Sequence, residues 1–519
     1  MSRSGIIFIS SIVLILLTSW FIVGNLTPYG SATTSDSLAY LDIANNIKNG
    51  NGVLATDFSL DNVGKHTLVL KKYWPPLYAS LLSVYIDNAS DVMTVSFISR
   101  ILLAISIIFI FLITYEAIGS VAFISSLLLC VTVPIITIYT YAWSETLFLP
   151  IFIITIWSSI KYLEFAGQSK LYRAAILLIL LTSLIMLAYT RYIGIVFIIL
   201  LPVIYFLSNR DRLDKLLLST AFFIYTATVG YLLYGNYIVS GHISGMARPP
   251  SDKSLVENLI DVYHVVLAVI PSSALLILTA LMVAGLIVYF IKTNTNRTTN
   301  TADKHSFHRV FILTIATFVY LITIFSLRSI KQFDMLDVRL LTPAFVTLYM
   351  LIAILPSFFK INNKTGMLVY FISFFFITSL SFNGYKQWLD TSKNWKALET
   401  PNLRLNSDLV YTNFTKSLNT KNKTNKLFSS LTQDGGVIVV KKALRYEFIT
   451  GVRCVEKPEN IDAENFLKIN SLPAGSLLLV HKPEFDQIIN KYIRRNSIYK
   501  YINIGNIMAL QLPVKSSIH

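Results

Sequence analysis

Long apolar segments separated by short polar connections make up the first three quarters of the chain. Segments of about 17 to 25 mostly uncharged residues can cross a hydrocarbon core about 30 Å thick as helices, which satisfy their own backbone hydrogen bonds. The composition agrees, with 54% apolar residues, 14% charged residues and a mean hydropathy of +0.60. The pattern predicts about eleven spans, at 5–23, 92–113, 119–141, 145–163, 172–189, 192–207, 216–234, 264–291, 309–327, 339–358 and 366–383.

Lysines and arginines concentrate in alternate short connections, and such connections face the cytoplasm. With an odd number of spans, the loop 24–91 and the tail 384–519 then lie on the outer face of the plasma (inner) membrane. The alternative is that the first span is a signal peptide cleaved near Ala32, but its apolar run is long and its amino end carries only Arg3. The cytoplasmic cations are Lys161, Lys170, Arg173, Arg210, Arg212, Lys215, Lys292, Arg297, Lys304, Arg309, Lys360 and Lys364.

The tail 384–519 has a different composition, with charges throughout and short apolar runs at 435–440, 475–480 and 506–512. These runs predict strands of a small α/β domain. The tail carries twenty Lys and Arg against eleven Asp and Glu. This excess indicates solubility or attraction to anionic head groups or phosphorylated substrates, whereas nucleic acid is an unsuitable partner for an outer domain. We therefore expect an all-α polytopic membrane domain at 1–383, followed by a small extracytoplasmic α/β domain.

The outer loop 24–91 contains the segment "TTSDSLAYLDIANNIKNGNG". A helix capped by Thr34 or Ser35 would place Asp36 on the same face as Tyr40. Asp42 lies roughly 120° round the helix and is expected to face water. The helix would lie beside the membrane and would end at Gly50 and Gly52. The alternative interpretation of Asp36 is a first-turn carboxylate that complements the helix dipole.

Further along the same loop, "KKYWPPLYASLL" (71–82) offers cations and amphipathic rings next to a pair of prolines. It is interpreted equally well as a membrane anchor or as part of a substrate site. Its candidate binding residues are Lys71, Lys72, Tyr73 and Trp74.

Ionisable residues also occur at the outer ends of other spans. They are Glu145 in "YAWSETLFLP", Arg191 in "YTRYIG", and Asp337 and Arg339 in "FDMLDVRLLTP". Charged groups at such positions are costly unless they are paired or line a wet cavity, so they are candidate binding residues. The alternative is structural pairing between helices, for instance of Glu145 with Arg191.

Other common sites are missing from the sequence pattern. The seven histidines lack the spacing of metal ligands, and no glycine-rich phosphate loop is present. No cofactor is predicted, although a divalent metal stays open. Cys130 and Cys454 lie far apart and predict no disulfide framework.

The order of these motifs resembles the integral-membrane glycosyltransferases of the GT-C fold, the group that includes protein O-mannosyltransferases and the lipid A aminoarabinose transferase. The resemblance covers roughly residues 1–390. It implies transfer of a sugar from a polyprenyl-phosphate carrier at the outer face, with an acid of the first outer loop, here Asp36, at the reaction centre. Many of these proteins carry an Asp-Glu pair at this point, whereas Ser37 follows Asp36 in this chain.

The sequence therefore favours a membrane glycosyltransferase in which Asp36 is the general base and the carrier is a co-substrate. The acceptor is a lipid, a glycan or a protein. A lipid-linked-sugar flippase or another transporter is the alternative, although a transporter typically places its polar groups near the bilayer midplane. An assembly or sensor protein is a third reading, but the inner loops are too short to hold an output domain.

Overall fold

The computed structural model divides the chain into two compact units. One comprises Met1–Ser31, Lys72–Tyr78 and Val95–Leu398, and the other Ala32–Lys71, Ala79–Thr94 and Glu399–His519. We call them the helical unit and the mixed unit. The structure describes residues 3–28, 30–57, 59, 68–69, 74–89, 91–164, 169–208, 212–270, 301–332, 336–355, 364–397, 436–440, 453–458, 461–462, 465, 468–469, 472, 476–481, 488, 500–504 and 507–512.

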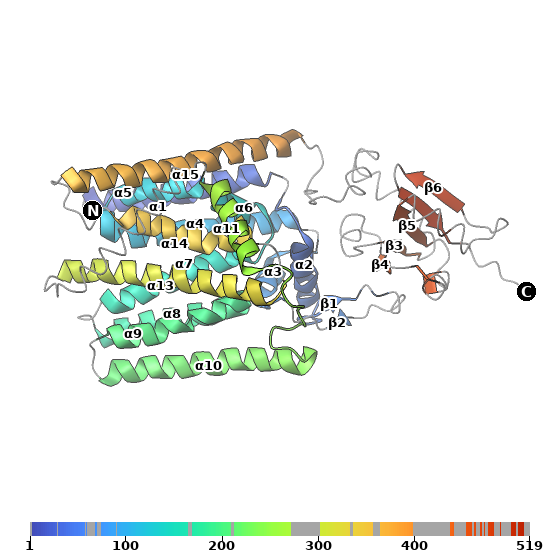
Figure 1. The fold of residues 1–519 in the computed structure, drawn as a ribbon, viewed down its shortest axis with the longest axis horizontal. Coiled ribbons are helices and arrows are strands. Elements are labelled where there is room, and N and C mark those ends of the chain that lie inside the picture. Colours follow the sequence, from blue (N-terminus) through green and yellow to red (C-terminus); the bar gives the residue numbers. More distant parts are fainter. Residues whose placement is uncertain are drawn as a thin grey trace, which may run out of the picture. The chain divides into compact units, whose positions relative to one another are not determined.

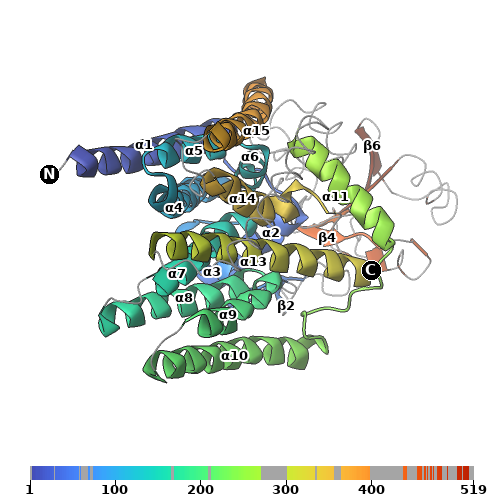
Figure 2. The ribbon, with the colours of Figure 1, turned by 60° about the vertical axis from the view of Figure 1, so that its left-hand side comes forward.

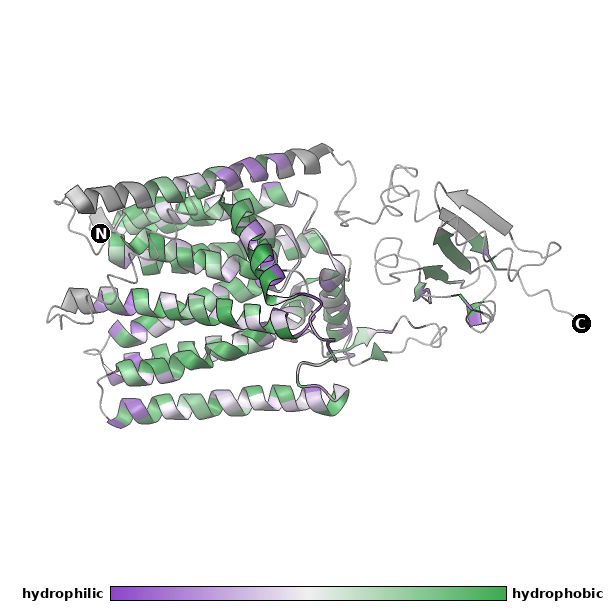
Figure 3. Ribbon diagram, viewed as in Figure 1, coloured by the Kyte–Doolittle hydropathy of each residue, from purple (hydrophilic) through white to green (hydrophobic). Residues whose placement is uncertain are grey.

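Long apolar helices run side by side in the helical unit (Figures 1 and 2). Six helices of the described residues are long and apolar enough to cross a membrane. Hydrophobic residues cover most of their length (Figure 3), and the chain is a multi-pass membrane protein. The six are α1 (Arg3–Leu26), α4 (Val92–Ile118), α7 (Glu145–Glu164), α8 (Lys170–Thr190), α10 (Arg212–Ser240) and α13 (Thr301–Ile330).

The predicted span 119–141 is bent by 51° into two helices, α5 (Val121–Cys130) and α6 (Val133–Thr140). A proline, Pro134, lies in the first turn of α6, where its missing N–H costs no helical hydrogen bond. The Leu128 carbonyl accepts from the Val131 N–H over 3.3 Å and from the Ser381 hydroxyl of a neighbouring helix over 2.8 Å, so this backbone group at the bend has two donors. Gly384 packs against the bend so closely that a Cβ atom there would lie 1.8 Å from the Val131 oxygen.

The remaining predicted spans correspond to helices of other lengths, or lie only partly within the described residues. The segment 192–207 is a short apolar unit of η2 (Tyr192–Ile199) and α9 (Leu200–Leu207), and 339–358 corresponds to the shorter helix α14 (Val338–Ile354). Segment 366–383 lies inside α15 (Lys364–Ala397), while α11 (Leu255–Val269) overlaps only the start of 264–291. Residues 271–300 lie outside the described residues. They include the rest of that predicted span and part of the polar segment after it.

The mixed unit contains α2 (Ser35–Lys48), the antiparallel pair β1 (Ala55–Thr56) and β2 (Leu68–Val69), and most of α3 (Leu77–Tyr85). Its C-terminal part holds a five-stranded sheet in the order β4-β3-β5-β7-β6. β3 is parallel to β4 and β5, whereas β7 is antiparallel to both of its neighbours. The strands are β3 (Ile438–Val440), β4 (Cys454–Glu456), β5 (Leu477–His481), β6 (Lys500–Ile504) and β7 (Ile507–Gln511).

The three apolar runs that predicted strands thus form β3, β5 and β7. Their inward side chains build a small core with Val439, Leu478 and Leu510 fully buried. The sheet combines parallel and antiparallel pairs, as expected of a mixed α/β domain.

Candidate active site

Three of the charged residues singled out from the sequence meet at one end of the helical unit. Glu145 is the first residue of α7 and is buried. Its Oε1 atom forms an ion pair with Arg191, and the Nε atom of Arg339 lies 3.4 Å from the same oxygen. The pairing of Glu145 with Arg191 that the sequence offered as an alternative is therefore present. We call Glu145, Arg191, Arg339 and Asp337 the arginine cluster.

Arg191 is held in a tight turn between α8 and η2. The Gly194 N–H donates to the Arg191 carbonyl over 2.8 Å. A Cβ atom on Gly194 would lie 2.4 Å from the carbonyl carbon of Leu187, so only glycine fits this turn without movement of the backbone. The close packing explains the glycine of "TRYIG". It aims the Arg191 side chain at Glu145 and leaves 24% of that side chain exposed.

Arg339 lies in the first turn of α14, and its surroundings fix its direction. Asp337 caps this helix, because its Oδ1 atom accepts from the Leu340 N–H over 2.9 Å, and its Oδ2 atom lies 3.7 Å from the Nε atom of Arg339. The Arg339 guanidinium stacks on the Trp143 ring at 4.9 Å from the ring centre. Trp143 in turn stacks on Tyr141, with ring centres 4.2 Å apart. Such a cation–π contact holds the guanidinium in place without neutralising it.

Burial makes the charge balance of the cluster important. Glu145 supplies one buried negative charge against two guanidinium groups, while the fourth charge, on Asp337, is about half exposed. The four side chains together carry two positive and two negative charges, and both guanidinium groups lie within reach of the Glu145 carboxylate. An anion with several oxygens suits such a pair, because guanidinium groups present forked donors that match phosphate or carboxylate.

A polar cavity of about 430 Å³ opens beside Arg339. The amide-bearing residues Asn383 and Gln387, from α15, line it together with Asp337 and Arg339. Asn383 also donates to the Ala268 and Val269 carbonyls at the end of α11, at 3.2 Å each. The cavity is lined by Val133, Thr137, Ala268, Asp337, Val338, Arg339, Asn383 and Gln387.

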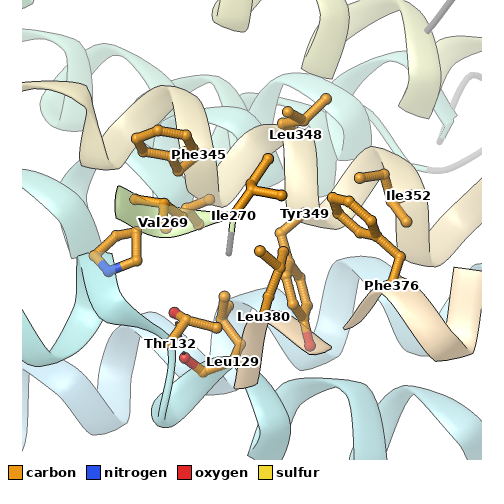
Figure 4. A pocket seen from close by; sticks show the side chains of 12 residues that line it. Leu129, Thr132, Val269, Ile270, Phe345, Leu348, Tyr349, Ile352, Phe376 and Leu380 are labelled. Atoms are coloured by element: carbon orange, nitrogen blue, oxygen red, sulfur yellow. Dashed lines mark hydrogen bonds between the residues drawn. The ribbon is translucent and has the colours of Figure 1, made fainter. Parts of the chain in front are cut away.

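A second, almost wholly apolar cavity is lined by α6, α11, α14 and α15, as the first one is, and also by Leu129 of α5 (Figure 4). The α14 residues Phe345, Tyr349 and Ile352 line the second cavity. They lie further from the start of the helix than Val338 and Arg339, which line the first one. On α15, Leu380 and Phe376 line the second cavity, and they precede Asn383 and Gln387, which line the first one. α6 and α11 contribute residues to both cavities. A polar space at the ends of α14 and α15 is thus followed by a small apolar space further along these helices.

Tyr78 is a site residue that the sequence interpretation missed. It is fully buried in the helical unit, and the carboxylate of Glu145 is close enough to act on it electrostatically. Burial raises the pKa of the Tyr78 phenol; contact with Thr146 lowers it by less, and negative Glu145 raises it further. Tyr78 is therefore neutral at physiological pH. The signal was present in "YWPPLYASLL", since α3 begins directly after the two prolines and buries the tyrosine.

The predicted helix around Asp36 is confirmed as α2 in the mixed unit. Thr34 is its N-cap and accepts from the Ser37 N–H over 3.4 Å, and Asp36 lies in the first turn and is half-buried. Tyr40 is buried. Gly50 and Gly52 follow the helix with positive φ angles of 78° and 79°.

The expectation that Asp42 faces water is wrong. Asp42 is buried and accepts two hydrogen bonds from Thr56, one from its N–H over 2.7 Å and one from its hydroxyl over 2.6 Å. The strand β1 folds back onto α2 and covers this face of the helix. A structural role for Asp42 follows, because removal of a buried acceptor leaves two donors without a partner.

The other candidates are only partly described. Lys71, Lys72 and Tyr73 lie outside the described residues, whereas Trp74 is half-buried just before the two prolines. Among the described residues, no group of three or more His, Cys, Asp or Glu side chains could hold a metal ion.

Comparison with solved structures gives the fold. ArnT from Cupriavidus metallidurans bound to undecaprenyl phosphate matches with a TM-score of 0.57 at 10% identity, over 98% of each chain. The same protein in the apo state matches with a TM-score of 0.52 at 10% identity, over 97% of each chain. The chain has the GT-C fold.

A third GT-C structure, the apo oligosaccharyltransferase of Archaeoglobus fulgidus, matches with a TM-score of 0.50 at 12% identity, over 91% of this chain and 69% of that chain. No protein-family model and no curated protein matches the sequence. The resemblance to the GT-C fold inferred from the order of short motifs is thus confirmed at the level of structure.

Proposed function

We propose that the protein is a membrane glycosyltransferase that moves a sugar from a polyprenyl-phosphate carrier to an acceptor at the outer face of the membrane. The observation that carries the proposal is the arginine cluster beside a polar cavity, with a small apolar cavity lined by the same helices further from their ends. A lipid phosphate needs this sequence of environments, with cations at the membrane boundary and hydrocarbon below. The undecaprenyl phosphate bound to the structurally similar ArnT supports this class of ligand.

Arg191 and Arg339 act on the carrier phosphate in this proposal. As the bond between the anomeric carbon and the phosphate oxygen breaks, the electron pair stays on the phosphate, and its charge increases. Fixed guanidinium donors stabilise such charge without reorganisation, because Glu145 and Trp143 already hold them. Trp74, Lys71, Lys72 and Tyr73 are further candidates for contacts with the carrier.

Asp36 is the proposed general base. The acceptor hydroxyl or amine forms a bond to the anomeric carbon and loses its proton, which passes to the Asp36 carboxylate and then to water. Asp36 follows the end of α1 at Leu26 by ten residues along the chain. The transferred group is either a hexose or a pentose.

The position of the charged groups favours an enzyme over a transporter. Glu145 is the first residue of α7 and Arg339 is the second residue of α14, so both lie at helix ends. A transporter typically binds its substrate near the bilayer midplane. A protein that moved the carrier across vesicles without consuming it would contradict our proposal and support the transporter.

The decisive experiment incubates the purified protein with a panel of polyprenyl-phosphate sugars and measures the release of free polyprenyl phosphate. Asp36→Asn should lower the rate by about 10² to 10⁴, the usual contribution of a general base, while carrier binding is retained. The matched control is Asp87→Asn, because the Asp87 side chain is 89% exposed and forms a surface ion pair with Lys48. Asp42→Asn is no control, since Asp42 is buried. Equal activity of Asp36→Asn and the parent on a confirmed substrate would exclude Asp36 as the base.

The outer location has its own test. Single cysteines introduced into the loop 24–91 and into the tail 384–519 should both react with a membrane-impermeant maleimide in intact cells, in a background from which Cys130 and Cys454 are removed. Labelling of either segment only after permeabilisation would contradict the outer location of the site.

A further inference from the structure

Arg100 is a charged residue in a membrane-spanning helix, away from the arginine cluster. It lies on α4, eight residues after the start of the helix, which is about 12 Å below the helix end. Its side chain is half-buried. A cation at this depth is costly unless it finds a partner or reaches the polar interface.

An aromatic ring stacks on this cation, whereas none of the described acidic residues forms an ion pair with it. The Arg100 guanidinium lies over the Trp20 ring of α1, 4.9 Å from the ring centre, and Phe97 packs edge-on against the same ring at 5.2 Å. None of the ion pairs among the described residues includes Arg100, and its buried Nε atom has no hydrogen-bond partner among them.

Gly24 makes room for the guanidinium. A Cβ atom on Gly24 would lie 3.5 Å from the Arg100 Cζ atom, in ordinary contact, so a larger side chain would cover the group. Gly24 is one helical turn closer than Trp20 to the end of α1. The Arg100 side chain therefore extends toward that end, as expected because side chains lean toward the start of their own helix.

The surface around Arg100 is lipid-facing. Leu17 and Phe21 on α1, and Phe97 and Ile101 on α4, are all exposed, which is typical of side chains in contact with acyl chains. A cation in such surroundings, close to the polar boundary, has one abundant complementary ligand, the phosphate of a lipid head group.

We propose that Arg100, Trp20 and Gly24 form a binding site for the phosphate of a membrane phospholipid, in the leaflet at the arginine-cluster end of the helices. α4 and α7 are separated by one span, the bent pair α5 and α6, and so both begin at that end. The guanidinium fork binds the phosphate oxygens, Trp20 holds the fork in position, and the absence of a side chain at Gly24 leaves the head group access. This inference needs only that the helices cross a bilayer, and it is independent of the proposed function.

Native mass spectrometry of the purified full chain, titrated with palmitoyl-oleoyl-phosphatidylglycerol, tests the site. Arg100→Gln should weaken binding of the first lipid about tenfold, which is the value of one charge-assisted hydrogen bond. Arg100→Lys should be intermediate, because it keeps the charge and loses the fork. The matched control is Lys386→Gln, since Lys386 is an exposed cation of α15 and should leave first-lipid binding unchanged.

Two further arms keep the test decisive. Should Arg100→Gln fail to fold, Trp20→Leu retains the cation and should weaken lipid binding about threefold through the lost stacking. Dioleoylglycerol, which has no phosphate, should bind the parent and Arg100→Gln equally. Unchanged phosphatidylglycerol binding in both variants would overturn the proposal. So would a loss of undecaprenyl phosphate binding without loss of phosphatidylglycerol, because Arg100 would then serve the carrier.

Discussion

Two buried carboxylates at opposite ends of α7 have very different surroundings. Glu145 begins the helix and belongs to the arginine cluster, whereas Glu164 ends it. Glu164 pairs with Lys161 over 3.1 Å and with Arg309 over 2.6 Å. Glu116, at the end of α4, contacts the same two cations. We call Glu116, Lys161, Glu164 and Arg309 the balanced network.

The surroundings of the charges separate the two regions. The balanced network has two carboxylates and two cations, and it ties α4, α7 and α13 together. The arginine cluster has two guanidinium groups on one buried carboxylate, next to a polar cavity. Paired charges that join three helices hold those helices together, while guanidinium groups beside a cavity can receive an anion. The comparison teaches that burial of ion pairs alone does not identify a site.

The largest expected effect concerns the balanced network. Lys161→Met removes a cation shared by two carboxylates and should lower the free energy of unfolding by about 3–5 kcal/mol, because a buried charge is left without compensation. The thermal unfolding midpoint in detergent measures it. The double variant Lys161→Met with Glu164→Gln should recover part of the loss, as the two positions are coupled. An unchanged midpoint in Lys161→Met would mean that the network does not hold the helices.

A smaller loss is expected at Gly194, beside the arginine cluster. Gly194→Ala places a methyl group 2.4 Å from the Leu187 carbonyl carbon, and the strain should cost about 1–3 kcal/mol and displace Arg191. Carrier binding should therefore weaken together with thermal stability. Gly230→Ala in α10 is the matched control, since a Cβ atom there meets nothing within 4 Å. Similar behaviour of the two variants would contradict the role of the tight turn.

The third effect separates charge from geometry in the arginine cluster. Arg191→Lys and Arg339→Lys keep the positive charge but lose the fork, so affinity for undecaprenyl phosphate should fall about tenfold each, with little loss of stability. Isothermal titration in nanodiscs gives the affinity. If both variants bind the carrier as the parent does while Lys161→Met still unfolds easily, the two regions are alike, and both are structural.

The smallest effect concerns an ion pair that is half exposed. Arg328 donates to Asp252 over 2.8 Å, and this bond holds the pKa of Asp252 below its ordinary value of about 3.9. The stabilisation is present above the ordinary pKa and is lost as pH falls through the lowered one. At neutral pH, Asp252→Asn should speed hydrogen exchange at the nearby Gln332 N–H, which donates to Pro249. The difference between variant and parent should vanish once pH has fallen below the lowered pKa of Asp252, where Asp252 is itself protonated. A difference that persists there would mean that charge is not its cause.

Much of the helical unit follows from local rules. Six predicted spans correspond to long apolar helices, and the capping residue and terminal glycines of α2 lie where the pattern indicated. The bend at 131–132 was missed, although Pro134 was visible in the sequence. Proline permits the start of a new helix there, but the close approach of Gly384 and the donor from Ser381 make the break stable. Those partners are distant in the chain.

The candidate site divides in the same way. The ionisable residues at helix ends were recognisable, because charges near a bilayer are costly and their presence asks for an explanation. Asp42 was misjudged, since the turn angle of an isolated helix cannot show that β1 folds back to cover that face. Tyr78, Tyr141 and Trp143 were overlooked as site residues because aromatic rings are common throughout this chain.

The sequence by itself determined where the chain can cross a membrane, where α2 begins and ends, and which polar residues needed a partner. These properties depend on hydropathy and on hydrogen bonds between near neighbours along the chain. Only the tertiary structure decided that Glu145 meets both Arg191 and Arg339, that Glu164 belongs to a balanced set, and that Arg100 stacks on Trp20 at a lipid-facing surface. Such pairings join residues that are remote in sequence. They exist because packing brings particular helix faces together, and the same charges with other neighbours would have had other roles.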